Sequence, residues 1–293
     1  MGFDTAYEAI SEESDSGHRW AFGTGFSDPL AGVDTTVPAG VDGADLAAYC
    51  LMLGDDALIM SHRLQQWLAR SPELEEETAL ANIALDLLGS ARLLLTRAGT
   101  ADGSKRTEDD YAFCRTEREF RNVRMVEAAD ADFAGLIARL LVFSTWRLAL
   151  LVRLRESVDP VLAAVAAAGV KETTYHRDYA AQWTIRLGDG TDYSRERMEA
   201  GLAEVAPLVD ELFAPTAVEE RLTGVAVNPA LVRPEFDDVL AQVLAAAGLH
   251  WPEIAGLAGV SGQAGRDGVH TEAMGYLLAE LQSVARAMPG ATW

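Results

Sequence analysis

The sequence predicts an all-α protein, a four-helix bundle with accessory C-terminal helices. Apolar residues recur three and four positions apart over most of the chain, which is typical of amphipathic helices. Proline, acidic residues and glycine stand where these segments begin and end. No segment shows a convincing alternation of apolar and polar residues, as a half-buried strand would. Four helices of roughly 25 residues, in two pairs with a longer middle connection, indicate a four-helix bundle.

The first two long helices form the first expected pair. An apolar stripe predicts a helix from about Asp45 to about Arg70. Pro72 in the first turn, followed by four glutamates beside the positive end of the helix dipole, predicts a second helix that stops at Gly99. A shorter charged segment, residues 108–125, follows a polar loop.

The second pair begins with Asp132, which is expected to open a helix that extends to about Arg155. Asp159 and Pro160 provide a cap and a proline at the first helical position, and predict a fourth helix that runs to Leu187. Beyond it we expect three shorter helices, at about 192–213, 235–248 and 271–287, the last of them capped near His270, Thr271 and Glu272.

The N-terminal segment, residues 1–44, differs in composition from the rest. It holds seven glycines, eight acidic residues and one basic residue, and it has no sustained periodicity. Because such a segment buries too little apolar surface to offset its ordering entropy, we expect a disordered or partner-bound acidic extension. The helical domain is then residues 45–293.

Charge and cysteine content limit the partners and the compartment. The 24 basic and 45 acidic residues of this 293-residue chain give a formal charge of −21, which repels phosphate backbones and anionic lipids. Uncharged stretches fall short of the ~18 residues of a membrane span. Two cysteines are too few for a disulfide framework. We therefore expect no nucleic-acid partner, no membrane partner and a cytoplasmic location.

A purely structural bundle is the simpler interpretation, and a di-iron centre is the functional one, whose ligand spacing can be tested directly. A ferritin-like di-iron bundle takes a Glu from each of two helices and a Glu-x-x-His from each of the other two. None of the five histidines has a Glu three positions before it, and the third helix has no acidic residue between Phe133 and Arg155. The sequence therefore predicts no metal and no cofactor in this chain.

Several polar residues nevertheless fall on the expected bundle helices. Because a buried carboxylate without a partner is costly, Asp86 is expected to pair with Arg139 or Arg147. Cys114 and His176 could in principle act as a nucleophile and its base, but no motif or spacing in the sequence favours this pair. The candidate buried polar cluster consists of Asp55, Asp56, Asp86, Arg139, Arg147 and Glu172.

Four arginines at every third position form a second candidate feature. Acidic residues are interleaved with them, so the simpler interpretation is a solvated or interface face. The alternative is a face that meets an anionic group such as a coenzyme A phosphate. The four residues are Arg115, Arg118, Arg121 and Arg124.

Several separate segments, in the same order, resemble the C subunit of the phenylacetyl-CoA 1,2-epoxidase complex. The resemblance covers about residues 45–293. The segments include Tyr49–Asp55, Ala79–Gly89, Lys171–His176, Arg186–Asp192 and Gly268–Glu272.

This resemblance implies a ferritin-like fold and a non-catalytic subunit of a multicomponent bacterial oxygenase. A related catalytic A subunit would hold the di-iron site, in an A2C2 core, with a B subunit and a reductase as further partners. The resemblance also implies that this chain lacks the metal ligands of the related catalytic A subunit. The vestigial ligand positions are Leu87, Ser90, Thr173 and His176.

Two alternatives stay open from the residues themselves. One is a metal-binding ferritin-like oxygenase active in its own right, with an atypical metal held by Asp86, Glu172 and His176. The other is a coenzyme A thioester binding module that uses the arginine face.

Overall fold

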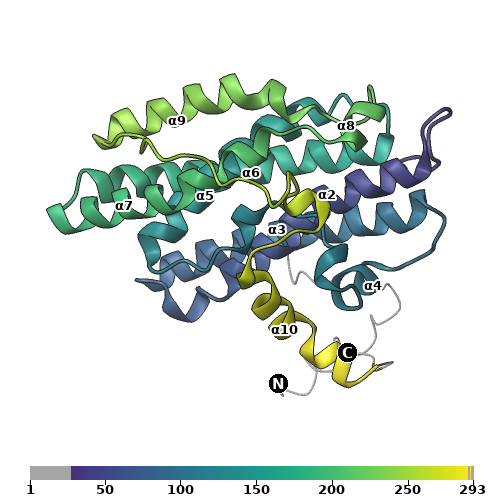
Figure 1. Ribbon diagram of the computed structural model, residues 1–293, viewed down its shortest axis with the longest axis horizontal. Coiled ribbons are helices and arrows are strands. Elements are labelled where there is room, and N and C mark those ends of the chain that lie inside the picture. The colour runs from purple at the N-terminus through teal and green to yellow at the C-terminus, as the bar shows by residue number, and fades with distance from the viewer. Residues whose placement is uncertain (1–27, 290, 292–293) are drawn as a thin grey trace, which may run out of the picture. The chain divides into compact units, whose positions relative to one another are not determined.

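The computed structural model describes residues 28–289 and 291, which are helical wherever they are regular (Figure 1). Val33–Trp293 form one compact unit. In the preceding unit, the described residues 28–32 form a turn in which Asp28 accepts hydrogen bonds from the N–H groups of Leu30 and Ala31. The described residues contain no strand, only an isolated bridge between Val260 and Gln263.

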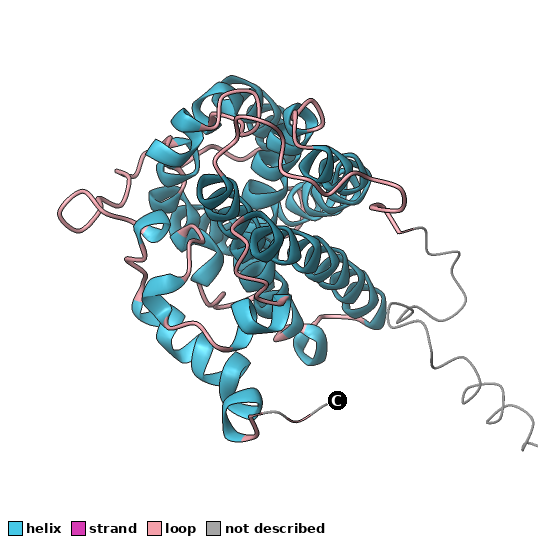
Figure 2. Ribbon diagram, turned by 90° about the vertical axis from the view of Figure 1, so that its right-hand side faces the viewer, coloured by secondary structure: helices cyan, strands magenta, loops and turns pink. Residues whose placement is uncertain are grey.

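Four long helices make up the centre of the compact unit, and they pair as the sequence predicts. Helix α2 packs along α3, α5 packs along α6, and α3 also contacts α6 (Figure 1). In the view turned by 90°, the helices lie packed side by side (Figure 2). Two arginine side chains of α5 also donate to Leu53 and Met60 of α2, so the two helix pairs are in contact with each other. The bounds are α2, Gly43–Gln65; α3, Leu74–Ala101; α5, Phe133–Leu154; and α6, Pro160–Gly188.

Aspartate side chains start three of these helices. Asp42 caps α2 through the N–H groups of Ala44 and Asp45, Asp132 caps α5, and Asp159 caps α6 ahead of the proline at its first position. Helix α2 therefore begins two residues before the expected Asp45.

The second helix differs from expectation at both ends. It begins at Leu74, with Glu73 at the N-cap and Pro72 outside it. It also runs through Gly99 to Ala101. At this helical position only glycine fits, because a Cβ on Gly99 would meet the carbonyl oxygen of Arg106 at 2.1 Å. The glycine thus serves close packing and is not a helix stop.

The extension also ends earlier than predicted, since residues 33–44 belong to the compact unit. The buried guanidinium of Arg97 on α3 donates to the carbonyls of Thr35 and Thr36 and pairs with the Asp159 carboxylate. The part of the expected extension before residue 28 lies outside the described residues.

Shorter helices cover the long ones. Helix α7 packs on α5, α9 packs on α5 and α6, and α10 packs on α4 (Figure 1). Helix α7 ends at Val205, before the expected residue 213, because Pro207 lacks the N–H that would continue it, and short 3-10 turns follow. The bounds are α4, Glu108–Phe113; α7, Asp192–Val205; α8, Ala217–Arg221; α9, Arg233–Ala247; and α10, Glu272–Ala287.

Two of the long helices, α3 and α5, have the length and hydropathy of a membrane span. In the most apolar 18-residue stretch of α5, 94% of the residues are buried among other helices, which is typical of the core helix of a folded domain. In the corresponding stretch of α3 the share is 39%.

Candidate functional site

The positions that the resemblance assigns to metal ligands meet where α3 contacts α6. Leu87, Thr173 and His176 are buried there, and Ser90 is partly exposed. Leucine cannot bind a metal, and a serine or threonine hydroxyl is a poor substitute for a histidine or a carboxylate.

A buried arginine of α5 lies at the same place. Arg147 is 2% exposed, and its guanidinium donates to the Ser90 hydroxyl at 2.9 Å and to the Leu53 carbonyl at 3.4 Å. Burial lowers the pKa of Arg147, whereas Asp56 and Glu172 act to raise it. A positive charge in this position repels a metal cation. The residues present therefore do not fit a di-iron centre.

Asp86 is hydrogen-bonded to a histidine of the facing helix. Its Oδ2 lies 3.0 Å from the Nε2 of His176, which is 2% exposed. The expected pairing of Asp86 with Arg139 or Arg147 is therefore wrong. In the sequence, His176 is grouped with Asp86 only as a possible metal ligand, because the spacing of residues on two separate helices does not show that their side chains bond to each other.

Glu172 lies one turn before His176 on α6. Burial and the neighbouring Asp86 raise its pKa to about 7, and Arg147 acts in the opposite direction. Asp86, Glu172 and His176 do not bring three ligand atoms within 4.8 Å of one another. Among the described residues, only Glu73, Glu75 and Glu76 do so. These lie at the positive end of the α3 dipole, which favours carboxylates without a cation.

The two adjacent aspartates of α2 bind arginines from distant segments. Asp55 pairs with both terminal nitrogens of Arg115, and the N–H of Arg121 donates to it at 2.8 Å. Asp56 accepts from both terminal nitrogens of Arg266, at 3.0 and 2.8 Å. These bonds hold segment 115–123 and the loop around Arg266 against α2. Nothing in the sequence singled out Arg266, which lies in a glycine-rich loop.

Arg139 closes a third, separate group. It pairs with Asp130, in the loop before α5, and donates to the Val126 carbonyl at 3.3 Å. The expected single polar cluster is therefore divided into three groups, at Asp55 and Asp56, at Asp130 and Arg139, and between α3 and α6.

The four arginines from Arg115 to Arg124 do not share a face. Arg115 is buried with Asp55, and Arg124 is buried with Glu211, whose Oε2 lies 2.7 Å from its Nε. Arg118 is exposed, and Arg121 is partly exposed. The expected face is wrong because no continuous helix carries the four arginines. The chain leaves α4 at Phe113, and its two short 3-10 turns, Glu117–Glu119 and Arg124–Glu127, are separated by extended backbone at Phe120 and Val123.

A buried glutamate fixes the start of α10. Oε1 of Glu127 lies 2.7 Å from His270 Nδ1, and Oε2 accepts from the N–H and the hydroxyl of Thr271, both at 2.7 Å. Burial disfavours the imidazolium, but the bond to Glu127 outweighs burial and raises the pKa of His270. Thr271 is at the N-cap as expected, although Glu127 supplies the capping oxygen.

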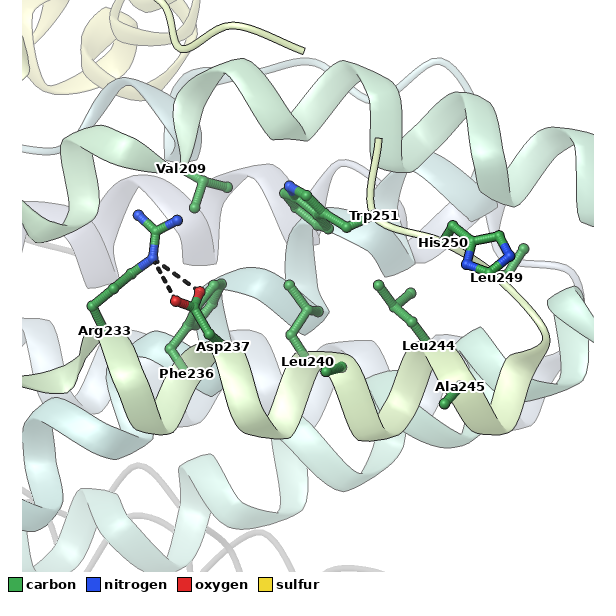
Figure 3. Close-up of a pocket in the computed structure, with 11 residues that line it drawn as sticks. Val209, Arg233, Phe236, Asp237, Leu240, Leu244, Ala245, Leu249, His250 and Trp251 are labelled. Carbon is green, nitrogen blue, oxygen red and sulfur yellow. Dashed lines mark hydrogen bonds and ion pairs between the residues drawn. The ribbon is translucent and has the colours of Figure 1, made fainter. Parts of the chain in front are cut away.

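A cavity of about 400 Å³ lies away from these groups, between α9 and the loop after it (Figure 3). Its walls are apolar, with Phe236, Leu240 and Leu244 on α9 and Trp251 opposite. At one end Arg233 donates to Asp237 at 2.9 and 3.0 Å. The cavity brings together no pair of groups that could act as nucleophile and base.

Comparison with known proteins gives two findings. Residues 33–293 match the family model described as "Phenylacetic acid catabolic protein". The chain is also 40% identical, over 250 residues, to the C subunit of the 1,2-phenylacetyl-CoA epoxidase of Escherichia coli (strain K12). That match covers 85% of this chain and 99% of the relative.

Proposed function

The chain belongs to the family of phenylacetic acid catabolic proteins, and we propose that it is the non-catalytic structural subunit of a multicomponent oxygenase that epoxidises the ring of phenylacetyl-CoA. The name of the relative supports the substrate and the subunit role. In this proposal the chain is a cytoplasmic protein with a ferritin-like four-helix bundle. The pairing of α2 with α3 and of α5 with α6 supports that bundle.

One observation carries the non-catalytic assignment. Arg147 places a guanidinium against Ser90, at a position where the resemblance implies a metal ligand. Two further expected ligand positions are occupied by Leu87 and Thr173, which are buried and lack a strong metal-binding group. The chain can therefore keep the bundle and its packing surfaces while the redox chemistry belongs to another subunit. We propose that the partner is a related catalytic A subunit that holds the di-iron centre, in an A2C2 core, with a B subunit and a reductase in the full complex.

Co-expression of this chain with the catalytic subunit of the same oxygenase tests the proposal. We expect the two to co-purify as a stable complex, and we expect turnover of phenylacetyl-CoA only when both are present. An Arg147→Lys variant keeps the buried positive charge and serves as a control for the structural role of that residue. A catalytic subunit that is equally stable and active alone would contradict the proposal.

Metal analysis of the separately purified chain distinguishes the structural subunit from an oxygenase active in its own right. We expect far less than one iron per chain after growth in iron-rich medium, because the Arg147 guanidinium lies against Ser90, one of the expected ligand positions, and repels a cation. Near-stoichiometric iron would support the alternative in which Asp86, Glu172 and His176 hold a metal.

A coenzyme A binding module is supported by one observation, a cavity of about 300 Å³ lined by Arg106, Arg115 and Arg121. Its walls also include Asp102 and Glu119, and Arg115 is committed to Asp55, so little positive charge is free for a phosphate. Calorimetry with phenylacetyl-CoA on the wild-type chain and on Arg106→Ala decides this alternative. Heat that the substitution abolishes would favour it.

A further inference from the structure

His270, in the loop before α10, has an acceptor at each of its ring nitrogens. Its side chain and that of Glu127 are both 0% exposed, and the ring Nδ1 lies 2.7 Å from Glu127 Oε1. The ring Nε2 lies 3.2 Å from the main-chain carbonyl oxygen of Phe120. A carbonyl oxygen can only accept a hydrogen bond, so Nε2 of His270 carries a hydrogen.

The other partners of Glu127 assign the hydrogen on Nδ1. Oε1 of Glu127 also accepts from the side-chain amide of Asn122 at 2.9 Å, and Oε2 accepts from the N–H and the hydroxyl of Thr271. A carboxyl group that accepts three hydrogen bonds from other donors is stabilised as the carboxylate, so Nδ1 of His270 donates to it. Both ring nitrogens therefore donate, and His270 is an imidazolium buried against a carboxylate.

Loss of one proton breaks this arrangement. Burial disfavours the imidazolium, but the bond to Glu127, the Phe120 carbonyl and the charge of Glu117 together raise the pKa of His270 above its ordinary value of 6.5. A neutral ring has one N–H and donates only one of the two bonds. The Glu127 carboxylate then stays buried without its cation, which is unfavourable.

The pair joins the turn around Glu127 to the start of α10. Arg63 of α2 donates to the main-chain carbonyl of Glu127 at 2.9 and 2.6 Å, and to that of Ala273, in the first turn of α10, at 3.4 Å. Helix α10 lies at the edge of the compact unit, where it contacts α4 and the 3-10 turns that follow α4 (Figure 1). The attachment of this outlying helix therefore depends on a buried group that titrates.

Other charged groups approach this pair from the elements packed around it. Glu117 lies on the 3-10 turn Glu117–Glu119, which contacts α10, and Arg63 comes from α2. The guanidinium of Arg121 approaches the same loop, since a Cβ on Gly268 would lie 2.9 Å from its Nη1. Arginines stay protonated and ordinary carboxylates stay ionised between about pH 6 and 9. His270 is thus the group of this set that changes charge in that range.

A second histidine, His62 of α2, faces α10 farther along and titrates in a different range. Its Nε2 lies 3.9 Å from Glu280 of α10 and has no hydrogen-bond partner among the described residues. Burial lowers the pKa of His62, although Glu280 acts to raise it. Its contribution to stability therefore changes below pH 6.5, whereas that of His270 changes above it.

We propose that the buried pair of Glu127 and His270 is a pH-sensitive latch that holds α10 on the bundle. While His270 carries both ring hydrogens, the loop before α10 is bonded to Glu127 and to the Phe120 carbonyl at once. When the proton is lost, one of these bonds is lost, and α10 opens more often from α4 and the turns that follow it. The latch needs only contacts within this chain and does not depend on the proposed function.

Hydrogen exchange of the α10 amides in the full-length chain, between about pH 6 and 9, tests the latch after correction for the intrinsic pH dependence of exchange. Because the pKa of His270 is raised in the folded chain, the stabilisation is fully present below pH 6.5 and is lost as pH rises through the raised value. We expect the protection of α10 to fall by up to about tenfold for each pH unit across this window and to level off above it.

His270→Gln replaces the ring with an amide that does not titrate in this range. At pH 6 we expect the protection of α10 in this variant to be roughly tenfold or more below that of the wild-type chain, because a buried bond to a charged group is lost. We expect no further fall up to pH 9. His250→Gln removes an exposed histidine from the loop after α9 and is expected to keep the wild-type profile.

An NMR titration of the histidine rings in the wild-type chain adds a measurement that needs no variant. We expect the His270 ring to lose its proton above pH 6.5, in the same range in which α10 loses protection. Constant protection of α10 between pH 6 and 9, or an equal fall in His270→Gln, would overturn the latch. If His270→Gln does not fold, the two wild-type measurements decide, and a His270 ring that loses its proton at or below pH 6.5 overturns the latch.

Discussion

Helices α5 and α3 have similar apolar character but differ in what covers them. In their most apolar stretches, 94% of the α5 residues and 39% of the α3 residues are buried within the chain. The α5 side chains are covered by α6, α7 and α9, whereas α3 packs mainly on α2 and also contacts α6 and α4. The apolar residues of α5 therefore stabilise the core of this chain, whereas most of those on α3 that are not buried are partly exposed, and Leu85 is the exposed one in this stretch.

The largest expected effect concerns a buried ion pair of α5. Arg139→Met leaves the Asp130 carboxylate, which is 5% exposed, without its partner. We expect a loss of about 3–5 kcal/mol in the free energy of unfolding, measured by urea denaturation.

Arg153→Met, on the same helix, is the matched control. Its pair with Glu235 is at the surface, with side chains 36% and 45% exposed, so we expect a loss of no more than about 1 kcal/mol. If Arg139→Met and Arg153→Met lowered the free energy of unfolding equally, burial would not determine how much these ion pairs contribute to stability.

A pair of leucine truncations compares the two helices directly. Leu141 on α5 is fully buried, and Leu141→Ala is expected to cost about 2–5 kcal/mol because it leaves a cavity. Leu85→Ala on α3 is expected to cost less than about 1 kcal/mol in the isolated chain. A Leu85→Ala variant that destabilises the isolated chain as much as Leu141→Ala would mean that α3 is part of the core.

The smallest expected effect is a pH dependence at the contact of α3 with α6. Glu172 has a pKa of about 7 in the folded chain against an ordinary value of 4.5, so the unfolded chain releases its proton at lower pH. Stability is therefore present at low pH and falls as pH rises from about 4.5 to about 7.

Glu172→Gln should remove this decline and raise stability at pH 7.5 by about 1 kcal/mol or less, since the side chain is partly exposed. Melting temperatures of both proteins between pH 5 and 8 provide the measurement, with Glu235→Gln as the exposed control. Parallel pH profiles for wild type and Glu172→Gln would show that another group titrates.

Most of the helical framework could be predicted from the sequence, because caps and periodicity are local. Asp132 and Asp159 start α5 and α6 as expected, and the four long helices pair in order. Gly99 shows where local reasoning is insufficient. Glycine is typical of helix ends, but Gly99 lies inside α3 and is required there because the Arg106 carbonyl packs against it.

The candidate site was predicted less completely. The absence of Glu-x-x-His is visible in the sequence, and the loss of ligands at Leu87 and Ser90 follows from the resemblance. The ion-pair partners are not visible, because Asp130, Glu127 and Arg266 lie in loops whose position depends on the folded chain.

The sequence by itself therefore determined the helical class, the order of the four long helices and the lack of a di-iron ligand set. Only the tertiary structure decided that Asp86 pairs with His176, that Arg147 lies against Ser90 and that α3 is less buried than α5. The reason is physical. Helix formation depends on residues within four positions of one another, whereas ion pairs and burial depend on which distant segments the packed core brings together.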